Sequence, residues 1–357
     1  MCWCLPSAQQ RVSEQWREQL NILVVGPSWV GDMVMSQSLL LRLKAEHPQC
    51  NIDVLAPDWC RPVLARMPEV NQAIAMPVGH GALQWKTRQG VAAELALNNY
   101  DQSLTLPNSL KSALVPWMAK IPKRIGWRGE MRYGLLNDIR VLDKLKFPLM
   151  VQRYIALAEP MVESATQLKP LLAPLLMVDF AAQQAVLERF SISEGDNLIA
   201  FCPGAEFGPA KRWPHYHFAA LASLLISEGK RIVCLGSAKD TPAIEEIKAL
   251  LTDDERQQFV DVSGKTQLTE AIDILARAQS IVSNDSGLMH IGAAVSTPMI
   301  ALYGPTSPDF TPPLSDRAEV IRLIGGYIKL RRAKTASGYH QSMIDILPQM
   351  VFDKLKG

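Results

Sequence analysis

The sequence lacks long uncharged apolar runs, a secretion signal and a large net charge of either sign. Its richest apolar stretch, residues 171–178, is interrupted by Pro174 and ended by Asp179, so no segment reaches the roughly 18 apolar residues of a membrane span. The N-terminus shows no charged segment followed by an apolar one, as a signal peptide would. We therefore expect a soluble protein of the cytoplasm.

Closely paired cysteines are also scarce. Of the six cysteines, only Cys2 and Cys4 stand close together, and no second pair has metal-ligand spacing. This disfavours a zinc site or a disulfide framework, and it favours buried or incidental thiols in a reducing compartment.

Charge is nearly balanced overall but concentrated locally. Lys and Arg number 37 against 35 Asp and Glu, a formal excess of +2 that cannot by itself drive tight nucleic-acid binding. Residues 111–146, however, hold nine basic and three acidic side chains, and a second basic cluster lies at residues 329–334. A solvated face explains such runs without any ligand, whereas an anionic lipid, a membrane surface or a nucleic acid would explain them functionally. Arg128 and Arg132 flank a short loop, which favours a discrete anion site.

Short apolar runs alternate with helical periods along the chain. The predicted strands are residues 22–25, 52–55, 73–76, 103–106 and 121–127, and then 198–202, 231–235, 259–262, 280–283 and 299–303. The predicted helices are residues 36–45, 91–97, 153–164, 181–190, 215–228, 244–251, 268–276 and 288–294. Because parallel strands need crossovers, this alternation predicts doubly wound α/β sheets.

The pattern restarts after a polar break at residues 191–197, and 357 residues suffice for two domains. We place an appended segment at residues 1–20, one Rossmann-like domain at 21–185 and another at 186–357. Ligands of such sheets bind beyond the carboxyl ends of the strands, so the loops there are where chemistry is expected.

The first of these loops reads GPSWVGDM, residues 26–33. It is not a dinucleotide fingerprint, which needs G-x-G-x-x-G. It is not a P-loop either, because Asp32 and Met33 stand where Lys and Ser or Thr would be required. A carboxylate at such a Gly-bounded turn can serve as a general base for a substrate hydroxyl, or it can cap the helix that follows. The spacing leaves both roles open for Asp32.

Two loops of the second half suit a phosphorylated ligand. Lys211, in a glycine-containing loop after a strand, can meet a diphosphate or be a solvated surface charge. At residues 283–290 a strand ends and a helix begins, so the free N–H groups of Ser286 and Gly287 favour a phosphate. Asp285 would repel that phosphate unless it serves sugar hydroxyls or a cap, and His290 is either a ligand or a packed helix histidine.

Two further loops of the second half follow predicted strands. Asp240 lies where carboxylates of nucleotide-binding folds often meet a ribose diol. Thr266 follows Gly264 in the other loop. Each signal is weak alone, and together they indicate one binding edge.

These blocks together resemble the bacterial ADP-heptose:lipopolysaccharide heptosyltransferases of glycosyltransferase family 9. The resemblance rests on GPSWVGDM (26–33), PGAEFGPAKRWP (203–214), NDSGLMH (284–290) and YGPTSPDFTPP (303–313). The blocks LPNSLKSALVP (106–116) and GWRGEMRYGLLND (126–138) are similar to its heptosyltransferase II subfamily. The resemblance covers the chain from about residue 21 onward.

The resemblance implies a GT-B fold, in which two Rossmann-like doubly wound domains face each other across a cleft. It implies transfer of L-glycero-D-manno-heptose from ADP-heptose to heptosyl-Kdo2-lipid A, with inversion at the anomeric carbon and without a metal or other cofactor. Asp32 matches the catalytic base, and Lys211 matches the lysine that meets the donor phosphates. Further matches to the donor site are Asp240, Thr266, Asp285, Ser286, Gly287 and His290. For the acceptor we expect Lys111, Arg128 and Arg132, with peripheral contact at the cytoplasmic face of the inner membrane and no nucleic-acid partner.

Other functions remain to be separated from this one. Another GT-B nucleotide-sugar enzyme would be a heptosyltransferase of different acceptor specificity or a sugar epimerase, which needs no acceptor. A non-catalytic protein that binds nucleotide sugars or anionic lipid would release no ADP. Nucleic-acid binding through residues 111–146 would be sensitive to salt.

Overall fold

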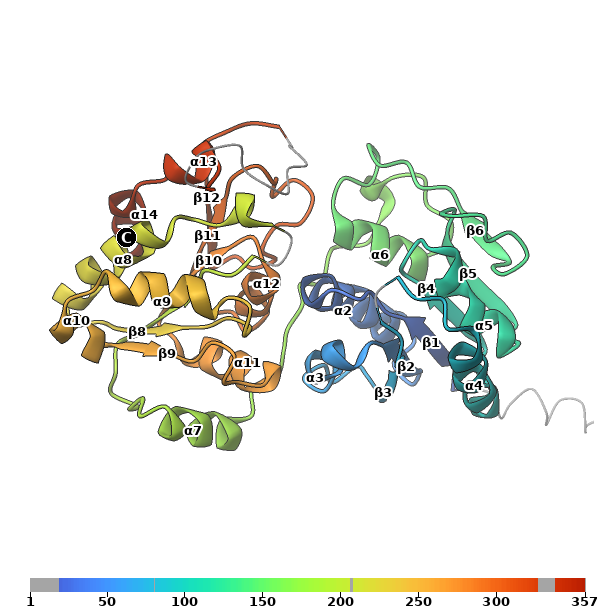
Figure 1. Ribbon diagram of the computed structural model, residues 1–357. Coiled ribbons are helices and arrows are strands. Elements are labelled where there is room, and N and C mark those ends of the chain that lie inside the picture. The colour runs from blue at the N-terminus through green and yellow to red at the C-terminus, as the bar shows by residue number, and fades with distance from the viewer. Residues whose placement is uncertain (1–18, 80, 206–207, 327–337, 357) are drawn as a thin grey trace, which may run out of the picture. The chain divides into compact units, whose positions relative to one another are not determined.

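The chain folds into two α/β units, each of which is described by itself. The computed structural model describes residues 19–79, 81–205, 208–326 and 338–356 (Figure 1). Unit 1 comprises Met1–Ser28, Ser38–Phe147 and Gln152–Leu172, and unit 2 comprises Trp29–Gln37, Pro148–Val151 and Ala173–Gly357. Most of the segment expected at residues 1–20, with Cys2 and Cys4, lies outside the described residues, as does the basic cluster at 329–334.

Unit 1 is built on a parallel sheet of six strands in the order β3-β2-β1-β4-β5-β6. Its strands are β1 (Asn21–Val25), β2 (Asn51–Ala56), β3 (Gln72–Ala75), β4 (Gln102–Thr105), β5 (Lys123–Trp127) and β6 (Asp138–Arg140). The helices that accompany it are α2 (Val30–Glu46), α3 (Arg61–Leu64), α4 (Trp85–Leu95), α5 (Leu114–Met118) and α6 (Met150–Ala158). The first residues of α2, up to Gln37, and of α6, up to Val151, belong to unit 2. This is the strand order of a dinucleotide-binding Rossmann sheet.

Unit 2 repeats the same order around β7, since its sheet runs β12-β11-β10-β7-β8-β9. Its strands are β7 (Leu198–Cys202), β8 (Arg231–Cys234), β9 (Phe259–Asp261), β10 (Ser280–Asn284), β11 (Met299–Tyr303) and β12 (Ala318–Arg322). Its helices are α7 (Phe180–Arg189), α8 (His215–Ser227), α9 (Thr241–Ala249), α10 (Asp253–Gln257), α11 (Leu268–Arg277), α12 (Gly287–Ala294), α13 (Gln341–Ile344) and α14 (Pro348–Lys356). The expected α/β class with two Rossmann-like sheets is therefore confirmed.

The central strands are apolar throughout because helices cover both faces of each sheet. Every residue of β7 and β11 is buried, as are the last four residues of β1. In unit 2 the core is closed by aromatic packing, with the rings of Trp213 and Phe218 edge to face at 4.8 Å between centroids. These rigid sheets fix the positions of the loops that follow their strands.

All ten predicted strands are present, each within two residues of the predicted ends. The strands β6 and β12 were not predicted, because they are edge strands that carry charged residues such as Asp138 and Glu319 instead of an apolar run. Helix α2 begins at Val30, six residues before the predicted start, so the second half of the GPSWVGDM loop is helical. Among the described residues, no helix is both long and apolar enough to cross a bilayer.

The change from unit 1 to unit 2 lies at Leu172 and Ala173, earlier than the boundary expected after residue 185. Helix α7 accounts for the difference, because it packs on α11. Gln183 Nε2 donates to the carbonyl oxygen of Asp273 at 2.8 Å, and Arg189 pairs with Glu270 at 2.8 Å.

Candidate active site

The loops after β7 and β10 lie at the point where the strand order of the second sheet reverses, which is where open α/β sheets bind ligands. Lys211 Nζ donates to Asp285 Oδ2 at 2.6 Å, so an ion pair joins the two loops. Asn284 fixes this arrangement. Its amide donates to the carbonyl oxygen of Pro203 at 2.7 Å, and its Oδ1 accepts from the backbone N–H of Trp213 at 3.1 Å.

The first turn of α12 presents polar groups without partners. Ser286 precedes the helix in an extended conformation, and its side chain does not cap the helix. Its Oγ is buried and has no hydrogen-bond partner among the residues that the structure describes. The first backbone N–H groups of a helix also have no partner within it, and the helix dipole favours negative charge there. The turn can therefore receive an anion.

Two glycines let the first turns of α2 and α12 approach closely. A Cβ on Gly31 would lie 2.6 Å from Cδ2 of His290, and a Cβ on Gly287 would lie 3.2 Å from Cβ of Val30. Any larger side chain at Gly31 would have to displace the His290 ring. This packing brings Asp32, the third residue of α2, into the electrostatic field of Lys211 and Asp285.

The carboxylate of Asp32 is half-buried and makes no hydrogen bond or ion pair within the described part of the chain. Burial, and after it the charge of Asp285, raise its pKa to about 6 against the opposing effect of Lys211. Asp32 lies inside the first turn of α2, not at the position before the helix, so the structure does not support the capping role. What remains is an ionisable group with free lone pairs and a pKa near neutrality.

His290 is buried in the first turn of α12, where burial lowers the pKa of its imidazole to about 4. The nearby Asp285 opposes this shift and Lys211 adds to it. The ring is therefore neutral at neutral pH, and it packs against Gly31. The histidine thus joins the two helices whose first turns carry Asp32 and Ser286.

Within the described residues, no hydrogen bond or ion pair joins Asp240 or Thr266 to this cluster. The Asp240 carboxylate accepts from Ser237 N at 3.0 Å and Ser237 Oγ at 2.8 Å, and it pairs with Arg212 at 3.3 Å. Gly204 packs directly on that carboxylate, since a Cβ there would lie 2.7 Å from it. Thr266 is half-buried in a neighbouring loop. Asp240 therefore joins the loops after β7 and β8.

Arg212 was not predicted as a site residue, although it adjoins Lys211 in the sequence. Its Nε is buried without a partner among the described residues, while Nη2 reaches Asp240 Oδ1 at 3.3 Å. Its place beside Lys211 at the end of a glycine-containing loop was the signal available.

Unit 1 contains a separate cavity of about 180 Å³ beyond the carboxyl ends of β1 and β4, its own point of strand reversal. Lys111 and Arg88 line it, together with Trp59 and Ser109, and its described lining includes no carboxylate. Arg88 donates to backbone carbonyl oxygens, those of Leu83 at 2.6 Å and Lys111 at 3.1 Å. The cavity is therefore positively charged.

The structure separates Arg128 from Arg132. Arg128 is exposed, whereas Arg132 is 1% exposed and donates to the Pro107 carbonyl at 2.7 Å and to Ser112 Oγ at 3.2 Å. Burial lowers the pKa of Arg132 to about 10, with Glu130 opposing, so it stays charged at neutral pH. Pro107 and Ser112 line the cavity, so Arg132 supports the cavity wall from behind.

Within the described ranges, no three His, Cys, Asp or Glu side chains are grouped to hold a metal ion. The chemistry that these side chains can supply is a base, an ion pair and an anion-binding turn in unit 2, with a cationic cavity in unit 1.

Comparison with known proteins matches residues 88–340 to the model of Glycosyltransferase family 9 (heptosyltransferase). Lipopolysaccharide heptosyltransferase 2 of Salmonella typhimurium is 57% identical over 339 residues, which are 94% of this chain and 97% of that protein. The structure of E. coli ADP-heptose lps heptosyltransferase II superposes with a TM-score of 0.86 at 54% identity, covering 94% of this chain and 98% of that one. E. coli heptosyltransferase WaaC with ADP shares the fold, with a TM-score of 0.68 at 19% identity and coverages of 94% and 99%.

Proposed function

This chain belongs to glycosyltransferase family 9, the heptosyltransferases, and we propose that it transfers L-glycero-D-manno-heptose from ADP-heptose to heptose I of the lipopolysaccharide inner core. The observation that carries the proposal is the meeting of an unpaired carboxylate, Asp32, with the Lys211–Asp285 ion pair and the open first turn of α12. The relatives named for ADP-heptose and for lipopolysaccharide supply the substrate class.

Unit 2 binds the donor in this proposal. An ammonium has three donors, and one N–H of Lys211 already meets Asp285, so others are left for a phosphate oxygen. Ser286 Oγ and the first N–H groups of α12 complete the diphosphate site. The ion pair with Lys211 offsets the negative charge of Asp285, which answers the objection that this carboxylate would repel a diphosphate. Asp240 and Thr266 contact the adenosine of the donor in this proposal.

Unit 1 binds the acceptor, whose Kdo carboxylates and lipid A phosphates are anionic. The cavity at Lys111 and Arg88 offers cationic groups without a competing carboxylate, and the exposed Arg128 adds another. We assign Arg132 to positioning, because its guanidinium is buried under the cavity wall. An acceptor carried by lipid A requires the enzyme to work at the cytoplasmic face of the inner membrane, in peripheral contact with it.

The reaction is a single displacement. The Asp32 carboxylate accepts the proton of the acceptor hydroxyl, whose oxygen forms a bond to the anomeric carbon while the bond to the ADP oxygen breaks. Attack from the side opposite the leaving group inverts the anomeric configuration. Lys211 and the first turn of α12 stabilise the charge that develops on ADP. A base with a pKa near 6 is largely ionised at pH 7 and still basic enough to assist.

The test is one incubation of the purified protein with ADP-heptose and heptosyl-Kdo2-lipid A, read by mass spectrometry. We expect one heptose to be added per acceptor and ADP to be released. An epimerised donor formed without acceptor, or no product at all, would contradict the proposal. A heptose added only to a different core acceptor would keep the reaction class and overturn the acceptor assignment.

A further inference from the structure

A second hollow in unit 1 has no part in the proposed reaction. It is a groove of about 350 Å³ that runs between α4 and α5, and its described lining includes no charged residue. Trp85 and Trp117 form its walls and are 48% and 43% exposed. Leu83 and Leu97, on either side of α4, are 51% and 79% exposed. Exposed tryptophans at an apolar groove are typical of an interaction site.

An exposed face of α4 lies along this groove. At about 100° per residue, Gln89 and Ala93 follow Trp85 along one face of the helix, and both line the groove with it. Leu95 lies on the side that is buried in the unit. Glu94 is about half a turn away from Trp85, so its carboxylate lies on the opposite side from the groove.

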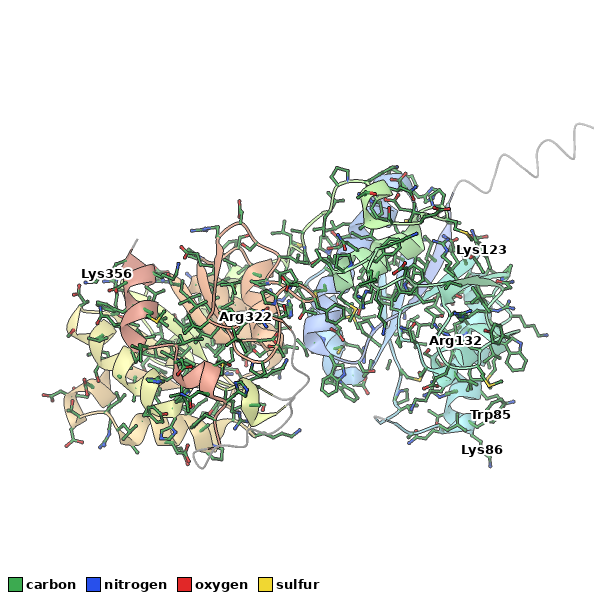
Figure 2. The ribbon with its side chains drawn as sticks, turned by 90° about the horizontal axis from the view of Figure 1, so that it is seen from above. Trp85, Lys86, Lys123, Arg132, Arg322 and Lys356 are labelled. Atoms are coloured by element: carbon green, nitrogen blue, oxygen red, sulfur yellow. The ribbon has the colours of Figure 1, made fainter. Side chains whose placement is uncertain are left out.

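Two exposed lysines adjoin the groove residues in the sequence. Lys86 follows Trp85 directly, and Figure 2 shows both side chains extending outward from unit 1. Lys120 follows the groove residue Met118 by two positions. We call these two lysines with Trp85 and Trp117 the docking face. It combines two indole rings with two positive charges.

We propose that the docking face binds the surface of a bilayer rich in anionic phospholipid, with the two indoles at the level of the headgroups and the lysines on the phosphates. Tryptophan is suited to this depth because it has a large apolar ring and one N–H donor. Lysines near the surface are attracted to anionic headgroups and can bury their methylene stems at the boundary. A partner protein would need a matching acidic patch, whereas an anionic bilayer supplies that charge everywhere.

The docking face lies close to the cavity proposed to bind the acceptor. Its role in catalysis rests on the proposed function. Helix α4 borders both hollows of unit 1, since Arg88 lines the cationic cavity and its neighbour Gln89 lines the groove. An acceptor anchored in the same bilayer would therefore present its sugars beside the surface on which the enzyme is docked. Docking would confine the enzyme and its acceptor to one plane.

The test is sedimentation of the full chain with vesicles, in the absence of either substrate. Vesicles of phosphatidylglycerol and phosphatidylethanolamine are compared with vesicles of phosphatidylcholine alone. We expect binding to the anionic vesicles that weakens with salt, because exposed charges are screened. Lys86→Glu and Lys120→Glu each lower the partition coefficient about fivefold or more, and Trp85→Ala with Trp117→Ala lowers it about tenfold or more.

Matched controls are Lys248→Glu and Phe180→Ala, which change an exposed lysine and an exposed aromatic residue of unit 2 and should leave binding unchanged. Turnover of a deacylated, soluble acceptor separates the two proposals, since docking-face variants should keep it. Absence of binding by the parent protein, or equal binding by all variants, would overturn the docking face while leaving the transfer activity untouched. Self-association without vesicles that Trp85→Ala abolishes would also overturn it, in favour of an interface between protein chains.

Discussion

The ionisation of Asp32 is set by a few neighbours. Its carboxylate is half-buried and lacks a hydrogen bond in the described structure. The negative charge of Asp285 disfavours its ionisation, whereas the positive charge of Lys211 favours it. These influences leave its pKa at about 6, above the 3.8 of an ordinary aspartate. A carboxylate held in this way is costly to ionise and is therefore a stronger base than an ordinary aspartate.

Activity should follow the ionisation of Asp32. We expect kcat/KM to be constant above about pH 7 and to fall tenfold per pH unit below about pH 6, as the base becomes protonated. Asp285→Asn removes a charge that raises the pKa, so the acid limb should move to lower pH. Lys211→Ala removes the opposing charge and should move it to higher pH. A limb that stays in place in both variants would contradict this electrostatic account.

The same shift predicts a stability effect of the opposite sign to the activity effect. A carboxylate whose pKa is raised on folding destabilises the native state once it ionises, so this cost is present above about pH 6 and vanishes below about pH 4. Asp32→Asn should therefore raise the free energy of unfolding at pH 7.5 by up to about 3 kcal/mol. Denaturant titrations at pH 7.5 and pH 5 check this, and a gain that does not shrink at pH 5 would contradict it.

The sequence pointed to Lys211, Asp285 and Ser286 because they follow recognisable strands, and the structure pairs Lys211 with Asp285. It could not predict that Gly31 packs on His290, since that contact depends on how two helices from distant parts of the chain approach each other. Nor could it distinguish Arg128 from Arg132, whose local surroundings in the sequence are alike and whose burial is decided by tertiary packing.

At the scale of the secondary-structure elements, two glycines differ in what surrounds them. A Cβ on Gly129 would lie 2.1 Å from the carbonyl oxygen of Asn108, so the loop after β5 packs on the loop after β4 through bare backbone. Gly90 lies inside α4 and a Cβ there would meet nothing within 4 Å. The first glycine is required by a close approach, whereas the second only weakens its helix.

Substitution of these two glycines should change stability in opposite directions. Gly129→Ala should lower the free energy of unfolding by about 1–3 kcal/mol, because backbone must shift. Gly90→Ala should raise it by about 0.5–1 kcal/mol through helix propensity. Thermal unfolding of the two variants beside the parent protein measures both effects. An equal loss in the two variants would show that the close approach at Gly129 does not matter.

The central strands were predicted well because β1, β7 and β11 are short apolar runs, which are typical of strands buried on both faces of a parallel sheet. The edge strand β12 was not predicted, because Glu319 and Arg322 interrupt its apolar pattern. It is recognised as a strand only by its pairing with β11. The start of α2 was placed too late for a related reason. Gly31 and Asp32 are poor helix formers in isolation, and packing of the first turn on α12 compensates for them.

At the scale of the whole molecule, the same strand order occurs twice and each sheet has its own hydrophobic core. The proposed donor site lies in unit 2 alone. ADP at about 100 times its dissociation constant should therefore stabilise unit 2 by about 2.7 kcal/mol. Hydrogen exchange should show added protection around Lys211 and Ser286, with little change in the strands of unit 1. Protection confined to unit 1 would contradict the donor assignment.

The role of Asp32 as the base is tested most directly by comparing the transfer rate and the ADP affinity of Asp32→Asn with those of the parent enzyme. The variant keeps the size of the side chain and loses the ability to accept a proton. We predict a fall in kcat of about 10²–10⁴-fold with an ADP dissociation constant within a few-fold of the parent value. Turnover close to that of the parent would contradict the account.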